Sequence, residues 1–407
     1  MQIREIEISG YRSLREFRLK LGGITILVGP NGCGKSNIYQ AVQLLGSAAH
    51  GQFAKRIAEE GGVPSLSWAG SRHISEEYRT RLAISFDQLK YEMEFGRIAI
   101  SERPSDGDEE GQEGLRLFKD DPDIKVETVE LVGDKPIALF SRKGNSVRAK
   151  NIEGRTVDYP VKLLKNESVL SELREPEKFP ELSSLRNMFA DWRFYHDFRT
   201  DLQSPVRRNQ LASMTPILSH DASDLAAVIA TIRTIGSAKE FDDLVDHAFP
   251  GARVSIEQDD GELCLYVSYP GLARPLHARE LSDGTLQFLC LLAALLTPRP
   301  ASFMVFNEPE TSMHTDLAEP LAELIIAASK RSQLLITTHS SEVARHVKAH
   351  GNCKIVELEK VDGETRIKGE EVRSIQAEVE DDDAAAVRAY RAALQMKQPQ
   401  ASSSDED

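Results

Sequence analysis

Residues 29–36 have the types and the spacing of a phosphate-binding loop. The segment GPNGCGKS fits the pattern G-x-x-x-x-G-K-[ST] in full. Its glycines let the backbone curl so that successive N–H groups face phosphate oxygens, and a lysine adds a charge for the β- and γ-phosphates. A serine hydroxyl at the last position is a ligand for Mg²⁺. We therefore predict that a nucleoside triphosphate and Mg²⁺ bind here, with the metal on Ser36 and the nucleotide on Gly29, Pro30, Asn31, Gly32, Cys33, Gly34, Lys35, Ser36 and Asn37.

The flanking residues predict the elements that hold this loop. The apolar run ITILV, residues 24–28, reads as a buried parallel strand, and residues 35–47 are compatible with a helix. Such a helix aims its positive end at the same anion. The plainer alternative is a glycine-rich turn between a strand and a helix that happens to contain Lys-Ser.

A second apolar strand is predicted at residues 303–306, within FMVFNEPE. In open α/β sheets the ligand lies at the carboxyl edge, which is where this strand delivers Asn307 and Glu308. A carboxylate at that edge can polarise the attacking water, so Glu308 is the predicted catalytic residue. Taken alone, an acidic turn after a strand is common.

A second helix N-terminus suited to an anion follows Leu281. The sequence LSDGT leads into the apolar segment QFLCLLAALL, so Ser282 and Gly284 stand at the start of a helix. One nucleotide does not need two phosphate-binding elements, but two copies packed head to tail would use both. The alternative is a simple serine N-cap on a core helix.

A third polar residue follows an apolar strand in LLITTHSSE, residues 334–342. The strand ends just before His339, at the place where a γ-phosphate would lie if this strand neighbours the phosphate loop. A single histidine at a strand end is usually structural. Its order and spacing after Glu308 favour a functional role.

Composition is that of an ordinary globular protein. The chain has 407 residues, is 41% hydrophobic and carries a formal net charge of −14, of which −11 falls in residues 101–123 and 375–407. The global charge therefore says little about what the folded core binds. No apolar run approaches the roughly 20 residues that a bilayer helix needs, and the four cysteines lack paired spacing. We expect a cytoplasmic protein that does not engage a membrane.

Periodicity predicts an α/β protein in three parts. Residues 1–159 and 250–370 are expected to form one discontinuous domain, with a central, mostly parallel sheet and an antiparallel β-layer. Residues 160–249 are expected to form an inserted helical subdomain, with helices at 160–173, 176–190, 222–235 and 238–248. Residues 101–123 are an acidic loop within the first part. Residues 371–407 are an acidic tail, expected to be disordered apart from a helix at 383–396.

These motifs, in this order, resemble those of an ABC-type ATPase of the SMC/RecF/OLD-like branch. ELSDGTLQFL, NEPETSMH and ITTHSSE are similar to segments of predicted ATPases in that branch, as is the start, ISGYRSLREFRLKLGGITILVGPNGCGKSN. The resemblance covers residues 1–50 and 275–350 well. The middle matches loosely, through WRFYHDF and DASDLAAVIATI.

The resemblance implies a P-loop NTPase of ABC/SMC-head type. It implies ATP-driven, head-to-tail dimerisation with two sandwiched nucleotides, reset by hydrolysis. Residues 29–36 would be Walker A, 303–308 Walker B and 310–314 the D-loop region. The site residues that it implies are Lys35, Glu308 and the switch histidine His339 in catalysis, Ser282, Asp283 and Gly284 in the signature, and Arg12 as a contact to the nucleotide or the signature region.

Three departures from the family pattern stand out. Asn307 occupies the Walker B position that normally holds an aspartate; its amide oxygen can accept from a metal-bound water but lacks the charge. Either hydrolysis is slow or metal binding relies more on Ser36. No glutamine can be assigned to the Q-loop. Only 68 residues follow His339, and the acidic run 380–383 lacks an α/β pattern around it, so no nuclease domain is predicted.

Two functions follow from these patterns. The favoured one is an ATPase that works as a homodimer or higher oligomer and controls DNA or an effector protein, in DNA repair or anti-phage defence. The alternative is a slow or non-hydrolysing, ATP-dependent scaffold that positions a separate nuclease or toxin. A transporter subunit is disfavoured because about 230 residues separate residue 50 from LSDGT.

A stretch rich in aromatic and basic residues, 192–208, also has two interpretations. Its arginines and rings are suited to contacting phosphates and stacking on bases. The alternative is ordinary packing within the helical subdomain. The residues concerned are Trp192, Arg193, Phe194, Tyr195, Phe198, Arg199, Arg207 and Arg208.

Overall fold

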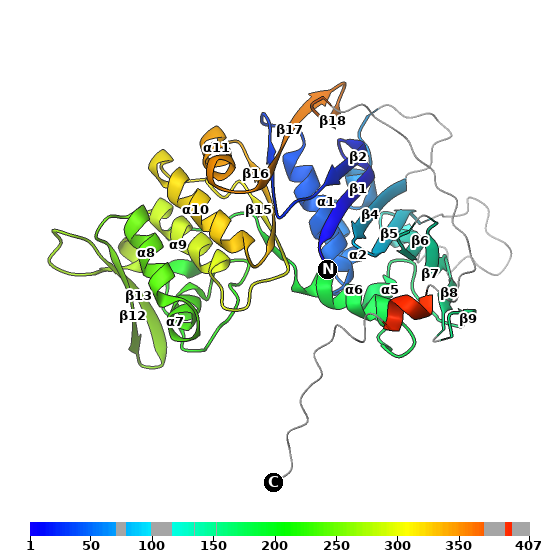
Figure 1. The fold of residues 1–407 in the computed structure, drawn as a ribbon, viewed down its shortest axis with the longest axis horizontal. Helices are drawn as coiled ribbons and strands as arrows, with labels where there is room; N and C mark the ends of the chain where they lie inside the picture. The colour runs from blue at the N-terminus through cyan, green and yellow to red at the C-terminus, as the bar shows by residue number, and fades with distance from the viewer. Residues whose placement is uncertain (71–78, 99–115, 134, 152, 370–386, 393–407) are drawn as a thin grey trace, which may run out of the picture. The chain divides into compact units, whose positions relative to one another are not determined.

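The computed structural model describes residues 1–70, 79–98, 116–133, 135–151, 153–369 and 387–392 (Figure 1). The chain divides into two compact units. Unit 1 comprises the described parts of residues 1–19, 44–190 and 371–407, and unit 2 comprises those of residues 20–43 and 191–370. Helix α1 (Lys35–Ala48) begins in unit 2 and ends in unit 1.

A six-stranded sheet forms the centre of unit 2, in the order β10-β15-β16-β3-β17-β18. The first five are parallel to one another, and β18 pairs antiparallel with β17. Strands β3 and β15 are apolar almost throughout, as expected of parallel strands covered on both faces. The strands are β10 (Arg193–Tyr195), β15 (Phe303–Asn307), β16 (Gln333–Thr338), β3 (Ile24–Val28), β17 (Cys353–Val361) and β18 (Glu364–Ile367).

Helices and a small antiparallel sheet complete unit 2. Helix α9 (Asp283–Leu295) is buried from its third residue onward because it is apolar on every side, and it packs against α7 and α10. The other helices are α7 (Leu225–Ile235), α8 (Ala238–Ala248), α10 (Ala318–Ser329) and α11 (Ser341–His350). The small sheet contains β11 (Gln210–Leu211), β12 (Arg253–Asp259), β13 (Glu262–Ser268) and β14 (Leu276–His277).

Unit 1 is built on an eight-stranded sheet, in the order β2-β1-β4-β5-β6-β7-β8-β9. From β1 to β9 the pairings are antiparallel, and alternate residues of β5 face the core. The strands are β1 (Ile3–Tyr11), β2 (Leu14–Lys20), β4 (Arg79–Phe86), β5 (Leu89–Arg97), β6 (Pro122–Leu131), β7 (Ile137–Lys143), β8 (Ser146–Lys150) and β9 (Thr156–Tyr159). The described helices include α2 (Phe53–Glu59), α3 (Val63–Leu66), α5 (Val169–Glu172) and α6 (Pro180–Asp191). Residues 387–392, the described part of the helix predicted at 383–396, are helical as well.

The predicted fold class is confirmed: a mostly parallel sheet carries the phosphate loop, and a separate antiparallel β-layer is present. The compact units divide the chain at other places than the predicted domains. Residues 191–249, expected in the helical subdomain, belong to unit 2, where Phe194 of β10 pairs with Val305 of β15. Most of the acidic loop and of the tail lies outside the described residues, and no described helix has the length and apolarity to cross a membrane.

The helix predicted over 160–173 is wrong for most of its length, because only residues 169–172 are helical there. The backbone carbonyls of Leu164 and Glu167 instead accept hydrogen bonds from the guanidinium of Arg142. These contacts hold residues 164–167 in a non-helical path before α5.

Arg142 belongs to a wholly buried ion pair in unit 1. The side chains of Arg142 and Glu127 are 0% exposed, and Nη1 lies 3.2 Å from Oε2. The Glu127 carboxylate also accepts from the Tyr91 hydroxyl at 2.8 Å and from the Ser168 hydroxyl at 2.7 Å. Burial, followed by the nearby Glu127 charge, raises the pKa of Tyr91. A buried charge that loses its partner is strongly destabilising, so this pair holds the β-layer together.

Replacing Arg142 should therefore destabilise the protein severely. We expect Arg142→Met to lower the free energy of unfolding by about 3–5 kcal/mol, because Glu127 is left buried and unpaired. The matched control is Arg148→Met, whose side chain is 60% exposed in its pair with Asp158. Urea denaturation measures both; equal midpoints for the two variants would contradict the assignment.

Candidate active site

The loop between β3 and α1 has the backbone shape that the sequence predicts. Gly32 and Gly34 have φ of 77° and 109°, a region that favours glycine. At Gly29 a Cβ atom would lie 2.6 Å from the carbonyl oxygen of Leu358, so no side chain fits there. The Asn37 N–H donates to the Gly34 carbonyl at 3.1 Å, so the helix starts directly after the loop. Its first N–H groups and its positive end therefore face the loop.

Lys35 is the first residue of α1, and its side chain is only 4% exposed. The ammonium donates to the carbonyl of Gly29 at 2.7 Å and to that of Pro30 at 3.3 Å. It also lies 4.0 Å from Oε1 of Glu308. The lysine is thus folded over its own loop, within reach of the predicted catalytic carboxylate.

The strand register brings the remaining groups to the same edge. Asn307, the last residue of β15, pairs with Thr337 of β16, and Thr338 pairs with Val28 of β3. Glu308 and His339 follow these strand ends directly. Both therefore leave the sheet beside the start of the phosphate loop.

Glu308 is held in an uncommon backbone conformation. Its φ is 52°, which costs a residue other than glycine about 1–3 kcal/mol. The hydrogen bond from its N–H to the Thr337 carbonyl, 2.8 Å, and the bond from the Thr311 N–H to its own carbonyl, 3.0 Å, hold it there. The carboxylate is 31% exposed, and its Oε2 lies 3.7 Å from Nδ1 of His339. It therefore sits between the lysine and the histidine.

Glu310 fixes the backbone that carries His339. Its Oε1 accepts from the Thr338 hydroxyl at 2.6 Å and from the N–H groups of His339 and Ser340 at 3.1 and 3.2 Å. The same oxygen lies 3.2 Å from Nδ1 of His339. The half-exposed imidazole is thus oriented by a largely buried carboxylate.

Asn307 uses both atoms of its amide group. Its Oδ1 accepts from the Thr337 hydroxyl at 2.7 Å, and its Nδ2 lies 2.7 Å from Nδ1 of His196. An amide nitrogen only donates, so His196 accepts at Nδ1 and carries its proton on Nε2. The His196 ring packs on Tyr39 with centroids 5.6 Å apart. One lone pair of Oδ1 is left for a further donor.

Two oxygen atoms fit the needs of Mg²⁺ at this edge. The Ser36 hydroxyl is exposed in the first turn of α1, and the remaining lone pair of Asn307 Oδ1 can accept from a metal-bound water. Among the described residues, no three His, Cys, Asp or Glu side chains gather as a metal site. The donor set thus fits an ion that keeps several waters and shares phosphate oxygens, without a protein cage.

The signature residues form the start of α9. The Ser282 hydroxyl accepts from the Thr285 N–H at 3.2 Å, which is a regular N-cap. At Gly284 a Cβ atom would lie 2.9 Å from the carbonyl oxygen of Ser312, so the helix start lies directly against the loop after Glu310. Asp283 is paired with Arg207 at 2.7 Å. The predicted signature and the predicted D-loop region are therefore in contact within one chain.

Arg12 lies in unit 1, where its guanidinium pairs with Glu60 at 2.8 Å and stands 5.6 Å from the ring centre of Tyr11. Its φ is 46°. The contact to a nucleotide or to the signature region that the resemblance implies for Arg12 stays a prediction.

The aromatic residues of the 192–208 stretch cannot stack on bases, because they are buried. The ring of Tyr195 stacks on Phe306 with centroids 5.2 Å apart, and Trp192 packs edge-on against Phe303 at 5.3 Å. The rings therefore pack, as the alternative had it, but against strand β15 of the central sheet and not within a helical subdomain. Residues that are buried in this way are Trp192, Phe194, Tyr195 and Phe198.

Three groups at the site were not predicted from the sequence. Glu310 was assigned only to a region, and no role was given to Thr337 or His196. A signal for His196 was available, since it is a polar residue directly after the short aromatic run WRFY. Nothing local marks Glu310 as an acceptor for the backbone near residue 339.

Comparisons with known proteins agree with this geometry. A family model described as "AAA domain, putative AbiEii toxin, Type IV TA system" matches residues 24–345. Chromosome partition proteins Smc from Clostridium kluyveri and Lactiplantibacillus plantarum are 30% and 28% identical over 107 and 108 residues, which is 25% of this chain and 9% of each relative.

A solved SMC head, bound to the C-winged helix domain of ScpA, has a TM-score of 0.52 and 17% sequence identity. That match covers 90% of this chain and 97% of that chain, and it establishes the fold alone. The family model matches well over half of the chain. The chain therefore belongs to this family of AAA ATPase domains, and its fold is that of an SMC-like P-loop head.

Proposed function

We propose that the protein binds ATP with Mg²⁺, hydrolyses it, and joins two copies head to tail in the ATP state. The observation that carries this proposal is the convergence of Lys35, Glu308 and His339 at one edge of the parallel sheet. An ammonium, a carboxylate and an imidazole beside a glycine-rich loop can supply the charge stabilisation and the water-orienting group that phosphoryl transfer to water uses. Membership of the AAA family supports an ATP-dependent activity.

In the binding step, the N–H groups of residues 29–36 face the phosphates, and Lys35 exchanges its two carbonyl acceptors for phosphate oxygens. The exchange is favourable because a charge-assisted bond to phosphate is stronger than a bond to a neutral carbonyl. Ser36 and Asn307 are the residues that would hold Mg²⁺, which would neutralise charge on the phosphates. The nearly complete burial of Lys35 strengthens its attraction to the anion.

In the hydrolysis step, Glu308 orients a water and accepts its proton. The water oxygen bonds to the γ-phosphorus while the bond to the β-phosphate oxygen breaks, which releases ADP and phosphate. His339 donates to a γ-phosphate oxygen from the position that Glu310 fixes. The strained backbone of Glu308 supports this role, because such strain concentrates at functional sites.

The head-to-tail dimer accounts for the second anion-ready helix end. Ser282 is exposed at the N-terminus of α9, and its neighbours contact Arg207 and Ser312. A second copy, turned by a twofold axis, would bring its own Ser282 to the γ-phosphate bound by the first. Each nucleotide is then closed between the two chains.

The dimer is proposed to control DNA or an effector protein, in repair or anti-phage defence. The description of the family names a toxin of a toxin–antitoxin system, which supports the control of an effector. The solved SMC head is bound to a domain of ScpA, so a head of this fold can hold a protein partner.

A slower, scaffold-like function has one observation in its favour. Asn307 stands where a charged carboxylate would order the metal, and its amide is already bonded to Thr337 and His196. A neutral ligand weakens the hold on Mg²⁺. In that case ATP binding would drive assembly of the dimer, and slow hydrolysis would return the dimer to monomers.

Two variants should separate nucleotide binding from hydrolysis. Lys35→Ala is expected to weaken ATP binding by about 100-fold or more, because the buried ammonium is lost. Glu308→Gln should keep the affinity but lower turnover by about 10²–10⁴-fold, because an amide cannot accept the proton. Fluorescent-nucleotide titration and phosphate release measure the two effects, with Lys55→Ala and Glu319→Gln as exposed controls. A Glu308→Gln chain that turns over ATP at the parental rate would refute the assignment of the base.

Glu310 should act through His339. We expect Glu310→Ala to lower turnover by about 10²-fold, because a displaced imidazole no longer meets the phosphate, while ATP affinity stays unchanged. Glu310→Gln keeps an acceptor oxygen, so its ATP turnover should lie between that of Glu310→Ala and that of the parent. If Glu310→Ala changed affinity and left turnover intact, the positioning role would be wrong.

Ser282→Arg should block the dimer without weakening ATP binding to the monomer. The arginine adds bulk at the point where two copies would meet, far in the sequence from the phosphate loop. Light scattering on a sizing column, with and without ATP in the Glu308→Gln background, measures the assembly. The control is Ser237→Arg, which changes another exposed serine N-cap in unit 2. Equal dimerisation by both variants would count against the head-to-tail arrangement.

A further inference from the structure

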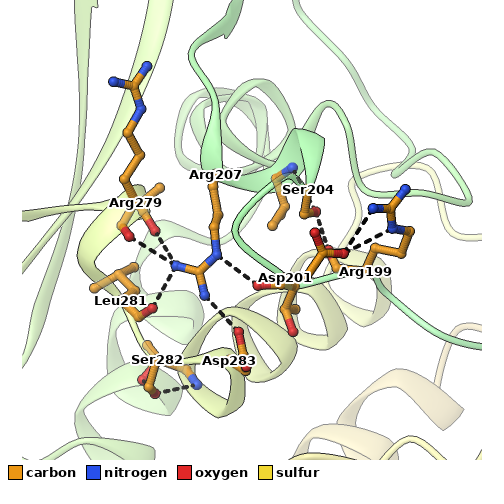
Figure 2. Close-up of polar contacts among 12 residues, drawn as sticks. Arg199, Asp201, Ser204, Arg207, Arg279, Leu281, Ser282 and Asp283 are labelled. Atoms are coloured by element: carbon orange, nitrogen blue, oxygen red, sulfur yellow. Dashed lines mark hydrogen bonds and ion pairs between the residues drawn. The ribbon is translucent and has the colours of Figure 1, made fainter.

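Arg207 is an almost fully buried arginine beside the signature. It ends a short 3₁₀ turn, Pro205–Arg207, and the residue as a whole is 5% exposed. Ser204 caps this turn: its hydroxyl accepts from the Val206 N–H at 3.3 Å and donates to the Arg199 carbonyl. Figure 2 shows the guanidinium between this turn and the start of α9. A buried guanidinium in this place must have a full set of acceptors.

The guanidinium binds the backbone on both sides. Nε donates to the Thr200 carbonyl at 2.7 Å, on its own segment. Nη1 donates to the carbonyls of Ala278, Arg279 and Leu281 at 3.2, 3.2 and 2.7 Å, and Nη2 to the Asp283 carboxylate at 2.7 Å (Figure 2). Four of the five acceptors thus belong to residues 278–283, the approach to α9. A planar, five-donor group suits such a fork of acceptors, whereas an ammonium does not.

These bonds set the direction of the signature amides. In a planar trans peptide the carbonyl and the following N–H point in opposite directions. The Leu281 carbonyl is held toward Arg207, so the Ser282 N–H points away from Arg207. Arg207 therefore presents this donor at the start of α9 while the helix N-cap is kept.

Arg207 also offsets a charge that would oppose an incoming phosphate. The Asp283 side chain is 58% exposed in the first turn of α9. Unpaired, that carboxylate would repel an anion at the same helix end; in the pair, the two charges cancel. The carbonyl dipoles of Leu281 and its neighbours are neutralised by the same group.

A neighbouring histidine adds to the hold on this loop. The Nδ1 of His277 accepts from the Arg279 N–H at 3.1 Å, and its Nε2 lies 3.1 Å from Oδ1 of Asn209. Burial, and then the nearby charge of Arg279, lowers the pKa of His277, in keeping with a neutral ring that accepts at Nδ1. Arg207 and Asn209, two residues apart, therefore both bond to residues 277–281, the loop before Ser282.

We propose that Arg207 is the positioning residue of the signature loop, and that the assembly of the ATP-bound dimer depends on it. This inference rests on the proposed head-to-tail function. The segment that carries Arg207 begins at His196, which is bonded to Asn307 at the metal side of the site. One stretch of twelve residues therefore touches the hydrolysis centre at one end and the signature at the other. Its arginine prepares the loop to meet the partner's γ-phosphate.

The test compares nucleotide binding with assembly. In the Glu308→Gln background, Arg207→Ala should raise the dissociation constant of the ATP-bound dimer by at least about tenfold, because four acceptors lose their donor. The affinity of the monomer for a fluorescent ATP analogue should stay unchanged. Arg207→Lys keeps the charge but not the planar set of donors, so its dimer dissociation constant should lie between those of the parent and of Arg207→Ala. The matched control is Arg208→Ala: the exposed Arg208 side chain bonds to the Gln203 carbonyl at 3.0 Å, and this variant should assemble like the parent.

Hydrogen exchange separates this inference from the proposed function. Without nucleotide, amides of residues 278–286 should exchange faster in Arg207→Lys than in the parent, while residues 24–37 should not change. If Arg207→Ala fails to fold, dimer dissociation and hydrogen exchange are both measured on Arg207→Lys. Parental assembly and parental exchange in the arginine variants would overturn the inference. A parent chain that never dimerises with ATP would overturn the proposed dimer, whereas altered exchange at 278–286 would still support the positioning of the loop.

Discussion

The shared carboxyl edge of β3, β15 and β16 is the constraint on which the site depends. Their parallel register aligns Asn307 with Thr337 and Thr338 with Val28, so that the residues after each strand meet at one place. A slip of one residue in any of these strands would turn its side chains to the other face and separate the groups. Close packing of the buried side chains on both faces disfavours such a slip, as does the cost of drawing the polar residues that follow each strand into the core. Rigid core packing thus supplies the precision that the chemistry needs.

Groups around this edge are held by tertiary hydrogen bonds as well as by strand ends. The Glu310 carboxylate accepts hydrogen bonds from the backbone N–H groups of His339 and Ser340. The Thr337 carbonyl accepts from the N–H of Glu308, whose φ is positive. Asn307 lacks the negative charge of an aspartate, but its amide group is hydrogen-bonded to Thr337 and His196. These bonds favour a well-ordered edge of the sheet.

The local parts of this site could be predicted from the sequence, because each is a contiguous pattern. The phosphate loop, the strand before Glu308 and the strand before His339 each carry their own apolar run and polar end. The parts that depend on distant contacts could not. Strand β10 has only three residues and is defined by its pairing with β15, and Arg207 looks like a surface arginine until the carbonyls of residues 278–281 surround it. Another non-local contact accompanies the wrong helix prediction at 160–173: the Arg142 guanidinium donates to the carbonyls of Leu164 and Glu167.

The central claim is that one chain supplies two incomplete halves of the ATP site, which a second copy completes. Mixing two inactive variants tests it most directly. Lys35→Ala chains lack the phosphate loop's ammonium but keep Ser282, whereas Ser282→Arg chains keep the loop, Glu308 and His339. A mixed dimer holds one intact site, and neither variant should assemble with itself, so mixing equal amounts should restore ATP turnover, at most to about half of the parental value. No recovery on mixing, or full turnover by Ser282→Arg chains alone, would contradict the account.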